Sequence, residues 1–320
     1  MSSVETLLDP AEARMTMFPL KRLDVWDFYQ KALACFWVPK EVDLSADRFE
    51  ELAPDEQHFV KYVLAFFAAS DNIVNENLEL NFAREVVLPE AKAFLHLQEA
   101  MEDVHSTMYS TLLSEYVKDP AERDFLVNAV TTVPCIRRKA EWARRWMDPA
   151  HPFHQRLVAF AIVEGVFFSG CFCAIFWLAQ QNKMPGLCKS NEFIARDEGL
   201  HTDFACLLYK GLSSKLADEE VHTMVREAIE IETGFVNESL PCALLGMNAQ
   251  KMAQYVRYVA DILLHKLGHP RLFAVKNPFA FMELIDLEGR TNFFEHRTTE
   301  YQKAHVLKPT TTTFLEVASF

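Results

Sequence analysis

The sequence predicts an all-α fold, a bundle of long core helices with additional peripheral helices. Half of the 320 residues are apolar and only 9 are glycine, whereas all-β folds need many glycine-rich turns. Proline and glycine divide the chain into long segments with apolar residues at helical spacing. No alternating run of β-branched residues competes with this pattern.

Prolines mark the expected starts of several helices. Pro54 and Pro89 are each followed by acids, and proline suits the first helical position while acids stabilise the first turn. Pro134 should kink or break the helix that Pro120 opens, because proline removes a backbone donor. The other expected helices cover about residues 23–34, 54–82, 89–117, 152–180, 190–209 (capped by Ser190 or Asn191), 218–240 and 247–267.

Two of these segments are apolar on nearly every side, which is typical of helices inside a bundle. They are Val60–Asn81 and Leu157–Gln180, and each carries one acid within its apolar run, Asp71 in the first and Glu164 in the second. Carboxylates are almost never buried without a partner. The two acids therefore indicate a polar site in the core.

Charge and composition exclude several classes of function. A formal charge of -13 makes a poor nucleic-acid binder, because neutralising phosphates requires clustered Lys and Arg. The N-terminus lacks the features of a signal peptide, and the longest apolar stretch, Val166–Ala179, is too short to span a bilayer. Seven cysteines without framework spacing indicate reduced thiols. We expect a soluble, cytoplasmic protein that binds no membrane.

Two Glu-x-x-His pairs lie on other predicted core helices. Glu102 precedes His105 and Glu198 precedes His201 by three residues, a spacing that puts both side chains on one helix face. A single such pair is a weak signal, since about one should arise by chance. A third copy at 219–222 sits among charged residues and is expected on the solvated surface.

The whole set matches the ligand pattern of di-iron and di-manganese carboxylate bundles. That pattern takes one acid from each of two helices and a Glu-x-x-His pair from each of two others. A set of six on four core helices is far more specific than either pair alone. The predicted metal ligands are Asp71, Glu102, His105, Glu164, Glu198 and His201.

Charge balance favours a metal centre over buried salt bridges. Burying four unpaired carboxylates costs well over roughly 10 kcal/mol, and two divalent cations would neutralise them. Oxygen ligands with one imidazole per metal suit iron or manganese, whereas zinc prefers a smaller tetrahedral shell. In the alternative reading the acids pair with Arg84 and Arg196, but two bases cannot neutralise four acids.

A tyrosine is expected to point towards the same centre. Tyr109 lies four residues after His105, on the same helix face. Phe168 and Phe172 follow Glu164 at four and eight residues, and Ile194 lies one turn before Glu198. Such apolar walls would shield a tyrosyl radical from water. An ordinary core tyrosine with a bonded hydroxyl is the alternative.

The residues around these ligands resemble one family, the small subunit of class I ribonucleotide reductase as found in eukaryotes and large DNA viruses. The similarity extends from about Phe18 to Tyr301 and rests on the strings FFAASDNIVNENL, AMEDVHSTMYS, VEGVFFSG, ARDEGLHTDFA and NPFAFMELIDLEGRTNFFE. It implies a ferritin-like bundle. Asp71 favours the reductase over related hydroxylases and ferritins, which usually carry Glu at this position.

The resemblance also implies a role for each residue. Two iron ions per chain, with manganese as the alternative, would be bound by the six ligands. Glu102 would bridge them, with Glu198 as a second candidate for this role. Reaction of oxygen at the reduced centre would oxidise Tyr109 to a stored radical. Trp37, Asp197 and His105 match the family's hydrogen-bonded relay towards the surface, and Tyr301 matches the tyrosine that passes the radical on.

The resemblance further implies a partner and a domain layout. The large subunit would carry out the reduction of ribonucleotides and would bind the end of the C-terminal tail at Phe320, and a homodimer is expected. Thr repetition and Pro predict a flexible tail. The expected parts are a flexible segment 1–17, a di-metal helical domain 18–302 and a docking tail 303–320.

Two other functions remain open from the sequence. A di-iron oxygenase or oxidase without a stored radical would explain the ligands but not Trp37, Tyr301 or the terminal tail. A non-catalytic helical binding protein would explain the fold alone. The metal content of the purified chain and its radical spectrum separate these hypotheses.

Overall fold

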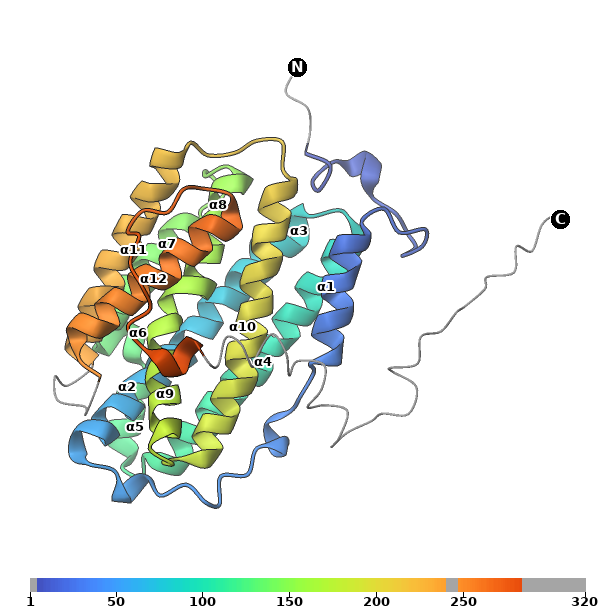
Figure 1. Ribbon diagram of the computed structural model, residues 1–320. Coiled ribbons are helices and arrows are strands. Elements are labelled where there is room, and N and C mark those ends of the chain that lie inside the picture. The colour runs from blue at the N-terminus through green and yellow to red at the C-terminus, as the bar shows by residue number, and fades with distance from the viewer. Residues whose placement is uncertain (1–4, 240–246, 284–320) are drawn as a thin grey trace. The chain divides into compact units, whose positions relative to one another are not determined.

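Every regular element in the described part of the chain is a helix, which confirms the predicted all-α class. The computed structural model describes residues 5–239 and 247–283 (Figure 1). Met1–Met282 form one compact unit. The α-helices are α1 (Leu23–Ala34), α2 (Pro54–Asn77), α3 (Ala83–Glu85), α4 (Pro89–Tyr116), α5 (Pro120–Val127), α6 (Ala129–Thr132), α7 (Pro134–Met147), α8 (Phe153–Ile162), α9 (Ser169–Gln180), α10 (Pro185–Gly211), α11 (Asp218–Ser239) and α12 (Ala249–Leu267).

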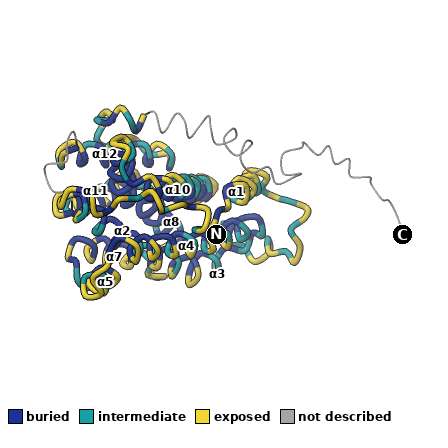
Figure 2. The backbone as a smooth tube through the Cα atoms, turned by 90° about the horizontal axis from the view of Figure 1, so that it is seen from below, coloured by how far each residue is buried: buried dark blue, intermediate teal, exposed yellow. Residues whose placement is uncertain are grey.

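The long helices pack side by side around one core. Helix α2 lies along α4, and α10 lies against α4, α8 and α9. Helix α1 covers α4 and α10 from one side, while α7, α11 and α12 pack on the other elements of the core (Figure 1). Most residues of α8 and α9 are buried. Most residues of α1 and α5 are exposed or half-buried (Figure 2). The bundle interior is therefore formed by α2, α4, α8, α9 and α10.

Five of the described α-helices begin at a proline, namely α2, α4, α5, α7 and α10. Pro54 and Pro89 occupy the first turns of α2 and α4, as predicted. The predicted break at Pro134 is also found, since α5 and α6 end before it and α7 begins at it.

The predicted cap of helix α10 at Ser190 or Asn191 is wrong. The helix begins at Pro185, preceded by Met184 in the left-handed region with φ 52°. The Ser190 hydroxyl donates to the carbonyl of Leu187 inside the helix (2.8 Å). Serine and proline are both start signals, and here the proline sets the boundary.

The predicted continuous helix over 152–180 is interrupted by a π-helical turn. Helix α8 ends at Ile162, the π turn covers Val163–Phe167, and α9 begins at Ser169. A second π turn, Leu78–Phe82, extends α2. Apolar spacing cannot reveal a single extra residue in a turn, and such turns occur frequently at functional sites.

The sequence analysis considered only the apolar run 166–179, which is too short to span a bilayer, but among the described residues one longer helical stretch is long and apolar enough by length and composition alone. It is Phe153–Gln180, and 94% of its most apolar window is buried inside the protein. Burial among other helices is what the core helix of a bundle requires.

The predicted terminal segments can be compared with the structure only in part. Within 5–17, Leu7 is buried and Arg14 forms an ion pair with the buried Glu90 (2.5 Å). The flexibility of 1–17 stays a prediction. The proposed tail 303–320 lies outside the described residues.

Replacing Leu64 by Ala should destabilise the protein by about 2–5 kcal/mol, because Leu64 is fully buried in α2 and the substitution leaves a cavity. Leu80, 45% exposed just beyond the same helix, is the matched control, and Leu80→Ala should cost no more than about 0.5 kcal/mol. Urea unfolding of both variants measures the difference. Equal losses would contradict the assigned core.

Candidate metal centre

Four helical segments bring the six predicted ligands together in the core. The π turn between α8 and α9 contributes one acid, α2 another, and α4 and α10 contribute one Glu-x-x-His pair each. All six side chains are at most 3% exposed. They are Asp71 from α2, Glu102 and His105 from α4, Glu164 from the π turn, and Glu198 and His201 from α10.

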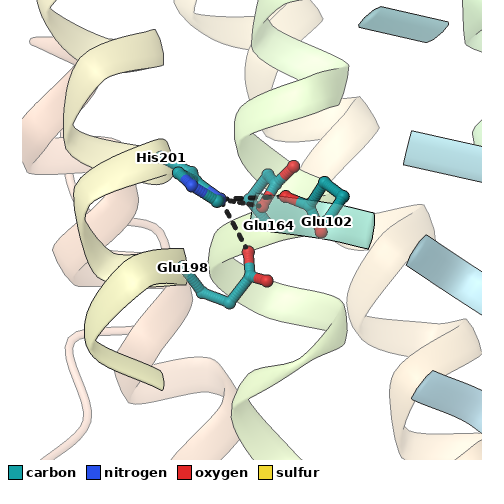
Figure 3. A group of neighbouring side chains, drawn as sticks. All are labelled: Glu102, Glu164, Glu198 and His201. Carbon is teal, nitrogen blue, oxygen red and sulfur yellow. Dashed lines mark ion pairs between the residues drawn. The ribbon is translucent and has the colours of Figure 1, made fainter. Parts of the chain in front are cut away.

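The side chains form two groups that share Glu102. Ligand atoms of Glu102, Glu164, Glu198 and His201 lie within 4.8 Å of one another, and so do those of Asp71, Glu102 and His105. Figure 3 shows the first group, in which His201 points into the three carboxylates. Its Nδ1 lies 3.0 Å from Glu102, 3.6 Å from Glu164 and 3.4 Å from Glu198.

Two of the carboxylates face both imidazoles. Glu102 and Glu198 lie 3.4 Å and 3.2 Å from Nδ1 of His105, in addition to their contacts with His201. A carboxylate with one oxygen towards each imidazole can bridge two cations. The geometry therefore suits the bridging role expected of Glu102, and gives Glu198 an equivalent position.

The polar atoms of this cluster lack ordinary hydrogen-bond partners. Both oxygens of Glu102 and Glu198, one oxygen of Asp71 and one of Glu164, and Nδ1 of both histidines are buried without a protein hydrogen bond. Buried polar groups are normally satisfied, so such a concentration requires an explanation. A set of convergent oxygens with two imidazoles fits hard divalent cations of the iron and manganese type.

Other buried acids in the described chain have conventional partners. Glu232 pairs with Lys139 at 2.6 Å, and Asp261 accepts backbone N–H groups from residues 272–274. Arg196, the base proposed in the salt-bridge alternative, pairs with Asp197 at 2.9 Å. For the four clustered acids, the described ion pairs involve histidine alone. The cluster therefore differs in kind from a structural salt bridge.

The pKa values of the clustered groups show the strain of this arrangement. Burial, together with neighbouring carboxylates, raises the pKa of Asp71 and of Glu164 well above the ordinary range. Burial alone would lower the pKa of His105 and His201, but close contacts with the surrounding carboxylates raise it well above the usual value. Burial opposes the ionisation of Glu198, yet its close contacts with Glu164 and both histidines bring its pKa below the usual value. The side chains thus share protons where cations would otherwise lie.

A hydrogen-bonded chain connects His105 with Trp37. The indole Nε1 of Trp37 donates to Oδ2 of Asp197 (2.7 Å), and the same oxygen lies 3.2 Å from Nε2 of His105. Burial opposes the ionisation of Asp197, but His105 and Arg196 hold its pKa below the ordinary value. An ionised carboxylate can only accept, so Nε2 of His105 donates a proton to Asp197, and Nδ1 is the nitrogen that faces the cluster.

Tyr109 is buried beside the cluster with a hydroxyl that has no protein partner. Burial raises the pKa of Tyr109 well above its usual value, and the charges of Asp71 and Glu198 raise it further. Its ring stacks on Phe67 with centroids 4.7 Å apart, and Phe67 in turn contacts Phe168 and Phe172 at 5.6 Å and 4.9 Å. The phenol thus lies within an aromatic wall.

Comparison with known proteins identifies the family. Residues 14–278 match the family described as "Ribonucleotide reductase, small chain". The chain belongs to this family. It is 55% identical to the ribonucleoside-diphosphate reductase small chain of Nicotiana tabacum, over 95% of this chain and 93% of that one. It is 51% identical to subunit M2 of the same enzyme in Homo sapiens, over 99% and 82% of the two chains.

A solved structure agrees with this assignment. The ribonucleotide reductase Rnr4 homodimer from Saccharomyces cerevisiae superposes with a TM-score of 0.80 and 34% sequence identity, covering 90% of this chain and 92% of that one. Family membership makes the chain the small subunit of an oxidoreductase that acts with a large subunit. Together with the carboxylate and histidine cluster, it places a metal site in the core.

Two residues near the centre were missed by the sequence analysis. Phe67, the direct neighbour of the Tyr109 ring, lies four residues before Asp71. Gln98, 2% exposed and four residues before Glu102, donates from Nε2 to Glu164 (3.3 Å). Both lie one helical turn before a predicted ligand, and this spacing is the signal that could have found them.

The remaining predicted residues have different outcomes. Ile194 is buried in α10, one turn before Glu198. Tyr301 and Phe320 lie outside the described residues. In the third Glu-x-x-His copy, Glu219 pairs with Arg226 and His222 contacts the carbonyl of Pro270, so this copy is on the surface as predicted.

Metal affinity of the apoprotein should rise with pH. His105 and His201 have raised pKa values, so they bind protons near neutral pH that must leave before a cation binds. Each proton released contributes about a tenfold rise in affinity per pH unit between about pH 6 and 8. Titration with Mn(II) at several pH values measures this slope. A flat profile would contradict the proton sharing described above.

Proposed function

We propose that this chain generates and stores a tyrosyl radical for ribonucleotide reduction, with the six clustered side chains holding two iron ions. The observation that carries this proposal is the buried hydroxyl of Tyr109. It has no protein partner, and burial together with the charges of Asp71 and Glu198 raises its pKa. When bound, the iron pair supplies the oxidising power, with oxygen as the oxidant, to remove an electron from a phenol. We assign the two metal ions as iron, with manganese as the alternative that a metal count tests.

Formation of a neutral radical requires the phenol proton to leave with the electron. Asp71 is the carboxylate with the largest electrostatic effect on Tyr109, and its Oδ2 has no hydrogen-bond partner. We assign Asp71 Oδ2 as the proton acceptor.

The aromatic wall explains how the radical would persist. Phe67 covers one face of the Tyr109 ring, and Phe168 and Phe172 pack against Phe67. All three phenylalanines are at most 7% exposed. They would exclude water and small reductants from the phenol.

The chain from His105 through Asp197 to Trp37 supports radical transfer out of the core. Trp37 is 1% exposed, while its neighbours Phe36 and Val38 are 37% and 39% exposed. The indole thus lies directly beneath the protein surface. We propose that Tyr301 continues this route and that the tail ending at Phe320 binds the large subunit, both by resemblance to the family.

We also propose a homodimer in the cytoplasm. A related protein of 34% identity was solved as a homodimer. The six cysteines of the described residues are buried and form no disulfide bond, which suits a reducing compartment.

Tyr109→Phe should abolish the radical while leaving the metal centre intact. The lost hydroxyl has no partner, so the free energy of unfolding should change by no more than about 1 kcal/mol. Iron content and electron paramagnetic resonance after exposure of the ferrous protein to oxygen measure both properties. A tyrosyl signal that survives in the variant would refute the assignment. Oxygen-dependent substrate hydroxylation without any radical in the parent protein would favour an oxygenase instead.

Trp37→Phe should separate radical storage from its use. Phenylalanine fills the site but cannot donate to Asp197, so the radical of Tyr109 should form normally while nucleotide reduction with a large subunit is lost. Trp26→Phe is the matched control on the neighbouring helix α1, and it should retain both activities. Full reduction by Trp37→Phe would exclude this route.

A further inference from the structure

A buried ion pair lies next to the centre without belonging to it. Nζ of Lys139 on α7 is 2.6 Å from Oε2 of Glu232 on α11, and the two side chains are 2% and 0% exposed. Burial raises the pKa of Glu232, and Lys139 counters that shift. Neither residue contributes to the ligand set or the relay.

The ammonium of Lys139 also binds the π turn that carries Glu164. It donates to the carbonyl of Phe167 at 2.7 Å, and Phe167 is the last residue of that turn. Where π hydrogen bonding changes to α hydrogen bonding, backbone carbonyls can accept from side-chain donors. The hydroxyl of Ser169 satisfies the adjacent carbonyl of Val166 (2.7 Å). Lys139 and Ser169 thus both donate hydrogen bonds to carbonyls at the end of the π turn.

The same ammonium also lies against two aromatic rings, one of which packs on the aromatic wall around Tyr109. It lies 3.5 Å from the ring centroid of Phe66 and 4.0 Å from that of Phe235. Phe66 packs edge to face on Phe168, with centroids 5.7 Å apart. A cation over these rings favours their present orientation. Lys139 therefore contacts both the backbone behind Glu164 and the rings behind Tyr109.

The fold makes room for the carboxylate of Glu232. A Cβ atom on Gly170 would lie 2.8 Å from Oε1 of Glu232, so glycine at this position lets α9 approach the carboxylate. Glu232 in turn fixes the position of the Lys139 ammonium from the α11 side. Helices α7, α9 and α11 thus meet at one charged contact.

Stability alone is a poor explanation for this pair. The cost of removing two charges from water can exceed their attraction, and apolar residues of similar size often replace a buried pair without loss. Hydrogen bonds from a fixed ammonium are directional, however, and apolar groups cannot reproduce them. We propose that Lys139 and Glu232 are positioning residues that hold the π turn so that Glu164 and Phe168 face the centre. This inference rests on the proposed metal centre.

The test compares two ion pairs that join the same helices. The variant Lys139→Met with Glu232→Gln removes the buried pair. Arg138→Met with Glu238→Gln is the matched control, because Arg138 and Glu238 also link α7 to α11 but their side chains are 44% and 48% exposed. Amide hydrogen exchange of residues 163–168 is measured in the apoproteins, and Mn(II) binding is measured by titration.

In the buried-pair variant, exchange over 163–168 should accelerate about tenfold or more, because the turn opens locally. The affinity of the weaker Mn(II) site should fall by about 10- to 100-fold, as expected when a group that orients a ligand is lost. The control should keep parental values in both measurements. Parental values in the buried-pair variant would overturn the inference.

Two further results keep the test decisive. If the double substitution prevents folding, Glu232→Gln takes its place, because the amide has the shape of the carboxylate. Smaller shifts of exchange and affinity in the same direction would support the inference. Parental values would overturn it. If the parent protein itself binds no Mn(II) or iron, the proposed metal centre fails independently of the role of Lys139.

Discussion

Four carboxylates and two imidazoles converge where water cannot solvate them, and the rest of the core is arranged around that constraint. Burial, and after it the repulsion between neighbouring carboxylates, raises the pKa of Asp71 and of Glu164. Buried acids outside the cluster bind a basic side chain or backbone N–H groups, as Glu232 and Asp261 do. The clustered acids have imidazoles instead, and cations are the partners that would balance them.

The helical bundle suits this task because each long helix can place a ligand at the same depth. A Glu-x-x-His pair directs two groups from one face, so α4 and α10 supply four of the six side chains. The π turn supplies Glu164 from a wider coil, whose end must then be held by side chains. The position of Glu164 therefore depends on the π turn and on the side chains that bind its end.

The clustered side chains border two different environments. One is formed by the aromatic rings around Tyr109, and the other is the polar path from His105 through Asp197 to Trp37. Separation of these two environments lets one protein both store an oxidising equivalent and release it. Asp197 is central to this division, because it fixes the orientation of His105 while accepting from the indole.

The sequence alone determined the helical class, most of the predicted helix starts and the six side chains that cluster in the core, because proline placement and three-residue spacing are local properties of a helix. It could not reveal contacts between helices. The stacking of Phe67 on Tyr109, the bond from Gln98 to Glu164 and the pair of Lys139 with Glu232 each join residues distant in the chain. The π turn also escaped prediction, because one extra residue in a buried, uniformly apolar helix leaves no periodic signal. Tertiary packing decided these features, because contacts between helices depend on how side chains from distant parts of the chain fit together in the core.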